Sequence, residues 1–311
     1  MMTNLNTLFL QLSGMDFSTF LQHLANGISL GSLYALVAIG YTMVYGTLRL
    51  INFAHGDIFM MTTYFAFYGV TTFMLPWYLS FVLAIILTAA LGVVLEVGAY
   101  RPLRDAPKIS IMISAIGASF LLENLATVLF GGRPKAFPSV KALTDSIQFG
   151  SVSIQKLTFV IPVVTLIFLF GLLFLIHRTK TGMAMRAVAK DYETAGIMGV
   201  NVNLTISKTF AIGSMLAAVG ALMWGLKFPQ IVPLMGIMPG LKAFIAAVIG
   251  GIGNIKGAMI GGFILGIGEI MIVAFAPSLS GYRDAFAFIF LIIILLFKPT
   301  GLTGEKIAEK V

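Results

Sequence analysis

Four long runs without a charged residue dominate the sequence. They cover residues 17–48, 58–95, 157–176 and 209–226, with lengths of 32, 38, 20 and 18 residues. A helix needs about 20 mostly apolar residues to cross the hydrocarbon core of a bilayer. Only 10% of the 311 residues are charged, whereas a soluble domain carries about 25%. The chain has too little charge to cover a water-facing surface, so we predict an integral membrane protein.

The apolar pattern predicts an all-α, polytopic fold with about eight or nine transmembrane helices, some of them broken or re-entrant. Because these spans use most of the chain, residues 1–311 are expected to form one domain. A fused catalytic or nucleotide-binding domain is excluded for lack of length. We place the spans near residues 19–47, 52–75, 77–99, 109–130, 157–176, 204–228, 284–297 and, as a glycine-rich pair, within 240–276.

The net charge of +8 indicates topology rather than nucleic-acid binding, because no basic stripe alternates with aromatic residues. Loops rich in Lys and Arg stay on the cytoplasmic side. Twelve basic residues fall on one predicted side and seven, Lys242 among them, on the other. This count predicts a cytoplasmic C-terminus and, if 19–47 crosses once, an external N-terminus. It also makes 131–156 the longest external loop and 177–203 the main cytoplasmic loop.

The loop at 177–203 is predicted to contain two short helices that meet at Asp191. An Asp at this position caps the second helix. Glu193 follows in the first turn, where a negative charge favours the helix dipole, and Gly199 supplies a stop. The loop is therefore expected to be structured.

Glycines recur every four residues in two neighbouring lines, Gly257 with Gly261 and Gly262 with Gly266. Such spacing lets helices approach closely in lipid. The first interpretation is that the spacing serves only close packing of helices. A second interpretation is that Gly250-Gly251-Ile252-Gly253-Asn254 breaks a helix and leaves backbone groups free to face a polar pathway, as in transporters with discontinuous helices. Both interpretations stay open at this stage.

Three carboxylates, Glu96, Glu123 and Glu269, lie inside apolar runs. Each costs at least ~2.5 kcal/mol to insert as a charge, so all three are expected to face protein or water. They either hydrogen-bond between helices or line a substrate route, and the sequence does not rank them. Glu96 is the one expected to form a structural ion pair, with Arg101.

The segment Asn52–Asp57 concentrates polar residues between two apolar stretches. We expect Asn52 to cap the following helix, whose N-terminal amides suit a substrate carboxylate. An ordinary helix start at the interface is the alternative. Together with the break and the buried carboxylates, this segment gives the candidate translocation pathway: Asn52, His55, Asp57, Glu123, Asn124, Gly251, Gly253, Asn254 and Glu269.

No known catalytic constellation is present in the sequence. It contains no Gly-x4-Gly-Lys-Ser/Thr phosphate loop, no His-Glu-x-x-His motif and no cysteine. His55 stands too far from other ligand types for a metal site. A non-catalytic transporter is favoured over a channel or a structural membrane protein.

Seven strings resemble the LivH-type inner-membrane permease subunits of bacterial ABC importers for branched-chain amino acids. They follow one another in the same order over nearly the whole chain, which makes the resemblance specific. The strings are GSLYAL at 31–36, GYTMVYG at 40–46, INFAHGD at 51–57, YRPLR at 100–104, MRAVA at 185–189, GGIGNIKGA at 250–258 and KPTGL at 298–302.

The resemblance implies an importer half located in the bacterial inner membrane. Its implied partners are a second, related permease, two cytoplasmic ATPases that hold ATP and Mg, and a periplasmic or lipid-anchored amino-acid-binding protein. The chain itself is implied to hold no cofactor and to contact lipid but no nucleic acid. Its ATPase-coupling segment resembles 183–200, where Thr194 replaces the family's Ala. The implied coupling residues are Arg186, Glu193, Thr194, Ala195 and Gly199.

The predicted function is import of branched-chain or other hydrophobic amino acids by alternating access, driven by the partner ATPases. The same class of importer for urea, short amides or another amino acid is the first alternative. An ion-coupled secondary transporter that uses Glu123 and Glu269 is the second, and a passive channel is the third.

Overall fold

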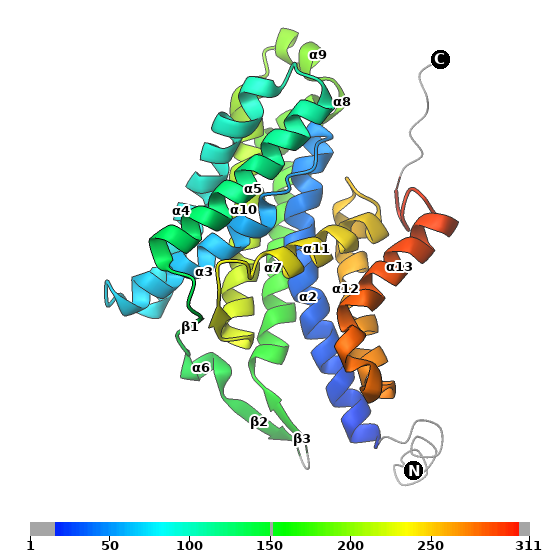
Figure 1. The fold of residues 1–311 in the computed structure, drawn as a ribbon. Coiled ribbons are helices and arrows are strands. Elements are labelled where there is room, and N and C mark those ends of the chain that lie inside the picture. Colours follow the sequence, from blue (N-terminus) through cyan, green and yellow to red (C-terminus); the bar gives the residue numbers. More distant parts are fainter. Residues whose placement is uncertain (1–15, 150–151, 305–311) are drawn as a thin grey trace.

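Helix α2, from Phe17 to Leu48, is the central element of the computed structural model, which describes residues 16–149 and 152–304 (Figure 1). Helices α7, α10, α11 and α12 pack around it. Almost all residues of α2 are apolar or small, so the helix could face lipid. Most of them are instead buried inside the bundle. It is therefore a core helix of the bundle, and lipid contacts fall to the helices around it.

The elements follow the predicted segments closely. The helices are α2 (Phe17–Leu48), α3 (His55–Thr71), α4 (Trp77–Leu95), α5 (Lys108–Phe130), α6 (Lys141–Thr144), α7 (Leu157–Arg178), α8 (Lys180–Lys190), α9 (Tyr192–Ile197), α10 (Val202–Lys227), α11 (Ile237–Gly250), α12 (Ile255–Phe275) and α13 (Arg283–Phe297). A π-helix, η1 (Glu96–Tyr100), and two 3-10 helices, η2 (Arg101–Leu103) and η3 (Pro277–Tyr282), complete them. The strands are β1 (Lys135–Ala136), β2 (Ser146–Phe149), β3 (Val152–Gln155) and β4 (Gln230–Ile231).

The prediction of an all-α polytopic membrane protein is confirmed. Among the described residues, seven helices are long and apolar enough to cross a membrane. Two shorter apolar helices, α3 and α11, occupy the remaining predicted segments. With 14 residues, α11 is ~21 Å long, which is short of the ~30 Å hydrocarbon core. It ends inside the bundle at a break instead of crossing.

Two ends of the bundle are distinguished by their loops. We call the end with α8, α9 and the turn between α4 and α5 the α9 side, and the end with the β2–β3 hairpin the β2 side (Figure 1). The α9 side carries the basic residues of the 101–108 and 178–190 segments. Lys242 was wrongly counted with loop residues of the opposite side, because it lies within α11 and is only 6% exposed.

The two glycine lines of α12 pack against two different helices. A Cβ atom on Gly261 would lie 2.0 Å from the carbonyl oxygen of Ala246 in α11. A Cβ atom on Gly266 would lie 2.2 Å from the backbone nitrogen of Gly31 in α2. Gly257 contacts the α11 side in the same way, and Gly262 contacts α2. Any larger side chain would separate these helices, so the glycine spacing fixes the position of α12 against both neighbours.

Short antiparallel strands lie on the β2 side. Strands β2 and β3 form a hairpin in which Ser146 pairs with Gln155. Strand β1 pairs with β4, with Lys135 opposite Ile231, and so ties the segment after α5 to the segment before α11. The predicted external loop 131–156 contains β1, α6, β2 and β3, and its buried residues Phe137 and Val140 pack into the core of the bundle.

Candidate functional site

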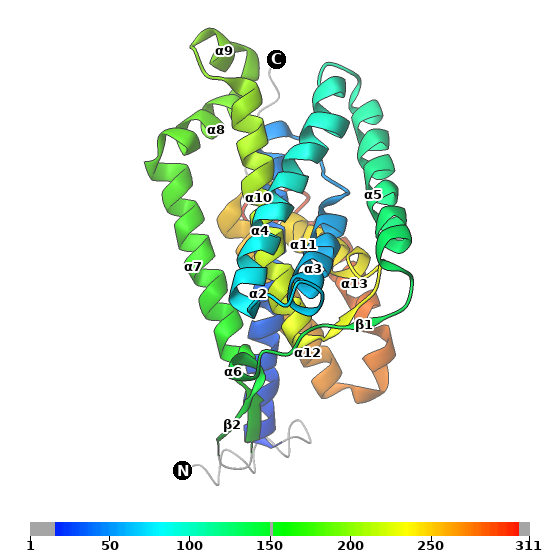
Figure 2. The ribbon, with the colours of Figure 1, turned by 90° about the vertical axis from the view of Figure 1, so that its left-hand side faces the viewer.

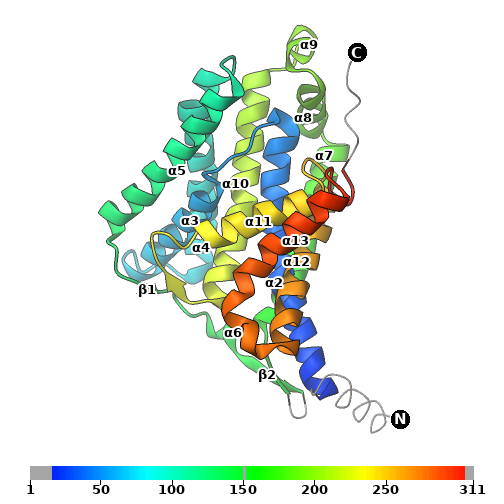
Figure 3. The same ribbon diagram turned by 45° about the vertical axis from the view of Figure 1, so that its right-hand side comes forward.

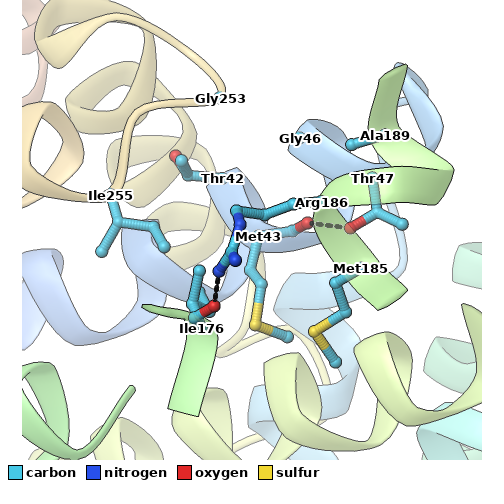
Figure 4. Close-up of a pocket in the computed structure, with 10 residues that line it drawn as sticks. All are labelled: Thr42, Met43, Gly46, Thr47, Ile176, Met185, Arg186, Ala189, Gly253 and Ile255. Carbon is cyan, nitrogen blue, oxygen red and sulfur yellow. Dashed lines mark hydrogen bonds between the residues drawn. The ribbon is translucent and has the colours of Figure 1, made fainter. Parts of the chain in front are cut away.

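A cavity of about 140 Å³ opens where α2, α7, α8 and the turn between α11 and α12 meet (Figure 4). Thr42 and Gly46 of α2 form one wall, and Arg186 of α8 and Gly253 of the turn face them. The cavity therefore brings a predicted coupling residue, Arg186, next to a predicted pathway residue, Gly253. Met43, Thr47, Ile176, Met185, Ala189 and Ile255 complete its lining.

Arg186 connects two helices at this cavity. Its guanidinium donates a hydrogen bond to the carbonyl oxygen of Ile176 near the end of α7 (Figure 4). The C-terminal carbonyls of a helix lack intrahelical partners and carry partial negative charge, so a cation stabilises them. A displacement of α8 would therefore also displace the end of α7 through this hydrogen bond.

The chain between α11 and α12 breaks sharply at glycines. Gly251 has a φ of 105° and Gly253 a φ of 97°, a region that residues with a Cβ rarely adopt. A Cβ on Gly251 would also lie 2.5 Å from the backbone nitrogen of Gly304. Asn254 then caps α12 by accepting hydrogen bonds from the amides of Lys256 and Gly257 at 3.1 and 3.2 Å.

The helix break of the second interpretation is present, but the carbonyls at the end of α11 are not free. The C-terminal segment after α13 binds them, with the amide of Leu302 donating to Ile249 O at 2.9 Å and that of Thr303 to Gly250 O at 3.0 Å. Asn254 also donates to Thr303 O at 3.1 Å. The physical reason is that carbonyls at a helix end inside a membrane protein need partners. The break is thus a closely packed joint between the end of α11, the start of α12 and the C-terminal segment. Leu302 of the KPTGL string is one of the residues that bind the end of α11.

Helix α9 has the predicted cap. Asp191 Oδ1 accepts from the amides of Glu193 and Thr194 at 3.0 and 3.1 Å. Its other oxygen accepts from the Thr194 hydroxyl at 2.8 Å, so the Thr that departs from the family pattern strengthens the cap. Gly199 ends the segment with a φ of 87°.

One face of α9 is anchored and the other is exposed. Ala195 is buried in a cluster with Val188 of α8 and Phe210 of α10. Ile197 and Met198 are 86% and 79% exposed, and Glu193 is exposed beside them. These two large apolar side chains lie next to each other at the protruding end of α9. The sequence interpretation missed Ile197 and Met198, because apolar residues are common throughout this chain.

Glu96 joins the end of α4 to the start of α10. It is fully buried and pairs with Arg101 at 2.6 Å and Arg104 at 3.1 Å. Ser207 of α10 donates to it at 2.8 Å. On an α-helix, positions 96 and 101 would lie about 140° apart, but the π-turn η1 brings them onto one face. The predicted Glu96–Arg101 pair is present. No sequence pattern indicated the π-turn or the hydrogen bond from Ser207 to Glu96.

The start of α3 lies inside the bundle. Asn52, His55 and Asp57 are 2%, 0% and 3% exposed. The expectation that Asn52 caps α3 is wrong, because its Oδ1 accepts from the hydroxyl of Tyr100 at 2.8 Å and no side chain caps this helix. In the part of the chain that the structure describes, neither ring nitrogen of His55 has a hydrogen-bond partner.

Asp57 links α3 to α5, where Ser119 donates to it at 2.5 Å. Glu123 lies one turn further along α5 and is half-buried, whereas Asn124 is exposed and donates to Phe120 O at 2.7 Å. Helix α5 packs mainly on α3 and η1 and stands apart from the rest of the bundle (Figure 3). Asp57, Ser119 and Glu123 thus form a polar line beside a face of α5 that packs on no other helix among residues 16–149 and 152–304.

Glu269 belongs to a buried charge cluster. Its carboxylate pairs with Lys242 at 2.6 Å and with Arg283, and it accepts from the Tyr34 hydroxyl at 2.9 Å. Lys242 also pairs with Asp284 at 2.5 Å. Two positive and two negative charges from α11, α12 and α13 therefore balance. The sequence analysis did not identify Lys242 as the partner of Glu269, because no local pattern links two residues that are 27 positions apart.

The candidate pathway residues do not form one site. They lie at the start of α3, along α5, at the joint between α11 and α12, and in the charge cluster of Glu269. Within residues 16–149 and 152–304, no group of three or more His, Asp or Glu side chains is arranged to hold a metal ion.

Comparison with known proteins gives consistent matches. A family model described as "Branched-chain amino acid transport system / permease component" matches residues 23–295. The high-affinity branched-chain amino acid transport system permease protein BraD of Pseudomonas aeruginosa is 43% identical over 307 residues, which cover 94% of this chain and 98% of that protein. LivH of Escherichia coli K12, described in the same words, is 42% identical and covers 95% and 99%. A solved structure of PsaBC from Streptococcus pneumoniae in complex with Fab covers 96% of this chain and 97% of its own, with a TM-score of 0.47 and 15% identity.

The charge cluster predicts a large loss of stability for Lys242→Met. Removing one partner of a buried ion pair costs ~3–5 kcal/mol when the other charge is left uncompensated. Arg283 still pairs with Glu269 in this variant, so the lower end of that range is expected. Lys156→Met is the matched control, because Lys156 pairs with Asp145 at 3.3 Å on the surface, where a pair is worth at most ~1 kcal/mol. The free energy of unfolding is measured by steric trapping in bicelles. Equal stability of the two variants would contradict this role of the cluster.

Proposed function

The chain belongs to the family of permease components of branched-chain amino acid transport systems, and we propose that it is the membrane subunit of an ATP-binding-cassette importer that takes branched-chain or other hydrophobic amino acids into the cell. The match of relatives over nearly their whole length, at 42–43% identity, carries this proposal. ATP hydrolysis belongs to separate subunits, and this chain supplies the route through the membrane.

The exposed end of α9 is the docking element for a partner ATPase in this proposal. Its capped start, its buried Ala195 and its exposed Ile197 and Met198 give a rigid projection with an apolar tip. The basic residues of the α9 side support a cytoplasmic location for this end. The C-terminus then lies in the cytoplasm and the N-terminus outside.

Two connections carry motion of α9 into the membrane. The first runs through Ala195 and the start of α10 to the Glu96 network at the end of α4. The second runs through α8, where Arg186 holds the end of α7 beside the joint at Gly253. Both are contacts between rigid helices, which transmit displacement with little loss. Alternating access is the mechanism that these connections serve.

The amino-acid route is proposed to follow α5 and the start of α3, opposite a second, related permease subunit. Asp57 and Glu123 offer acceptors for an ammonium group along this line. The surrounding surface of α5 is apolar, with Leu121 at 63% and Leu125 at 38% exposure, and suits a hydrophobic side chain. Selection at high affinity is assigned to a separate binding protein.

The alternative of an ion-coupled transporter finds less support in this geometry. An ion-coupling carboxylate must exchange its ion during the cycle. Glu269 instead has three partners, in Lys242, Arg283 and Tyr34. A group held in this way serves packing of α11 against α12.

The function is tested by uptake of radiolabelled leucine into proteoliposomes that contain this chain, its partner permease, both ATPases and the binding protein. We expect uptake that requires ATP and the binding protein and continues when ion gradients are collapsed. Uptake driven by a gradient without ATP would refute the proposed class. If a binding protein loaded with another solute stimulates ATP hydrolysis and no leucine is taken up, the proposed substrate is wrong. The assignment to ATP-driven importers would still hold.

Ile197→Glu and Met198→Glu are expected to reduce ATP-dependent uptake at least tenfold, because each places a charge on the apolar tip that docks on the ATPase. Both side chains lie on the surface, so the amount of chain in the membrane should not change. Leu21→Glu is the control, since Leu21 is 47% exposed on the β2 side. Uptake and co-purification of the ATPases are measured together. Normal values for both α9 variants would remove α9 from the interface.

Cysteine labelling tests the route, because the chain contains no cysteine. Glu123→Cys should react with a polar, membrane-impermeant thiol reagent, and His55→Cys should react only while ATP is hydrolysed. Ala126→Cys on the same helix should stay protected, since Ala126 is fully buried. Mass spectrometry counts the modified chains. Protection of position 123 in every state would place the route elsewhere.

A further inference from the structure

A second, larger cavity of about 660 Å³ lies apart from the coupling elements. It is formed by the C-terminal half of α3, the N-terminal half of α4 and the last residue of α5. Helices α4 and α5 are joined at the α9 side and diverge toward the other end, with α3 between them (Figure 2). Neither the proposed route nor the ATPase contact uses this cavity.

Its two walls differ in chemistry. On one side, Tyr64 stacks on Phe130 with ring centroids 4.4 Å apart, and Tyr68 lies 5.2 Å from the same ring. The other side is aliphatic and open to the surroundings of the bundle, with Leu83, Ile86 and Leu87 at 39%, 56% and 51% exposure. A flexible hydrocarbon fits between such walls.

A cation lies beside the aromatic wall. The ammonium of Lys135 is 5.7 Å from the ring centroids of both Phe67 and Tyr68. Across the described part of the chain, no carboxylate pairs with Lys135. Arg133 is exposed two residues away, and the sequence from 124 to 144 contains no Asp or Glu. This edge of the cavity is therefore positive and lacks a counter-charge.

We propose that the cavity binds one phospholipid, with an acyl chain along Leu83, Ile86 and Leu87 and its phosphate at Lys135 and Arg133. A phospholipid is the molecule of a membrane that combines a long hydrocarbon with an anionic group. The volume lies within the ~300–1,000 Å³ range of sites for single small ligands.

The test is binding of phosphatidylglycerol to the delipidated full-length chain in detergent, measured by native mass spectrometry. Leu87→Trp fills the cavity and should weaken binding about tenfold, as if about two methylene groups had left it. Lys135→Gln should weaken phosphatidylglycerol binding roughly fivefold, the share of one cation near an anionic lipid, and should leave diacylglycerol binding unchanged. Leu166→Trp on α7 and Lys141→Gln are the matched controls and should bind as the unaltered chain does.

Three results would overturn the proposal. Binding that is unchanged in both Leu87→Trp and Lys135→Gln would show that the lipid lies elsewhere. Diacylglycerol binding as tight as that of phosphatidylglycerol would remove the phosphate contact. Loss of the bound lipid when the partner permease is added would assign the cavity to the subunit interface. Inorganic phosphate alone should not bind, because the acyl chain supplies most of the affinity.

Discussion

Backbone polar groups inside a membrane must find partners within the protein, and the joint between α11 and α12 shows how strictly this chain obeys that requirement. The glycines at 251 and 253 turn the chain, which exposes the last carbonyls of α11. The C-terminal segment then returns from α13 and binds Ile249 and Gly250. Without that segment the break would lack partners, and α11 would have no fixed end. The position of α13, the cavity at Arg186 and the start of α12 all follow from this joint.

Two of the three membrane carboxylates also find partners within the described part of the protein. Glu96 is neutralised by two arginines at the end of α4, and Glu269 by Lys242 and Arg283 in the bundle. Glu123 has neither arrangement and stays half-buried on the loosely packed α5. Since an unpaired charge in lipid is costly, the two paired carboxylates serve structure. In the proposed function, a substrate or a partner subunit pairs with Glu123.

The helices differ in how closely they pack against the rest of the chain. Helices α2 and α12 approach closely along Gly262 and Gly266, so they form a fixed unit. Helix α5 and the exposed end of α9 have few contacts within the described part of the chain, and the proposed function assigns the partner surfaces to them. The Glu96 network lies between these parts, because it connects the end of α4 to the start of α10 beside α9. In the proposed mechanism, motion at α9 reaches α4 through this network and reaches the joint before α12 through Arg186.

The sequence by itself determined the membrane class, the positions of nearly all helices, the two short helices around Asp191 and the family. These properties depend on local composition, on spacing of apolar and small residues, and on strings that lie close together in the chain. Only the tertiary structure decided that Asn52 binds Tyr100 instead of capping α3, that Lys242 is the partner of Glu269, and that the C-terminal segment binds the helix break. Each of these contacts joins residues that are 27 or more positions apart. Partners at that separation are chosen by how the helices pack, and no local pattern records that choice.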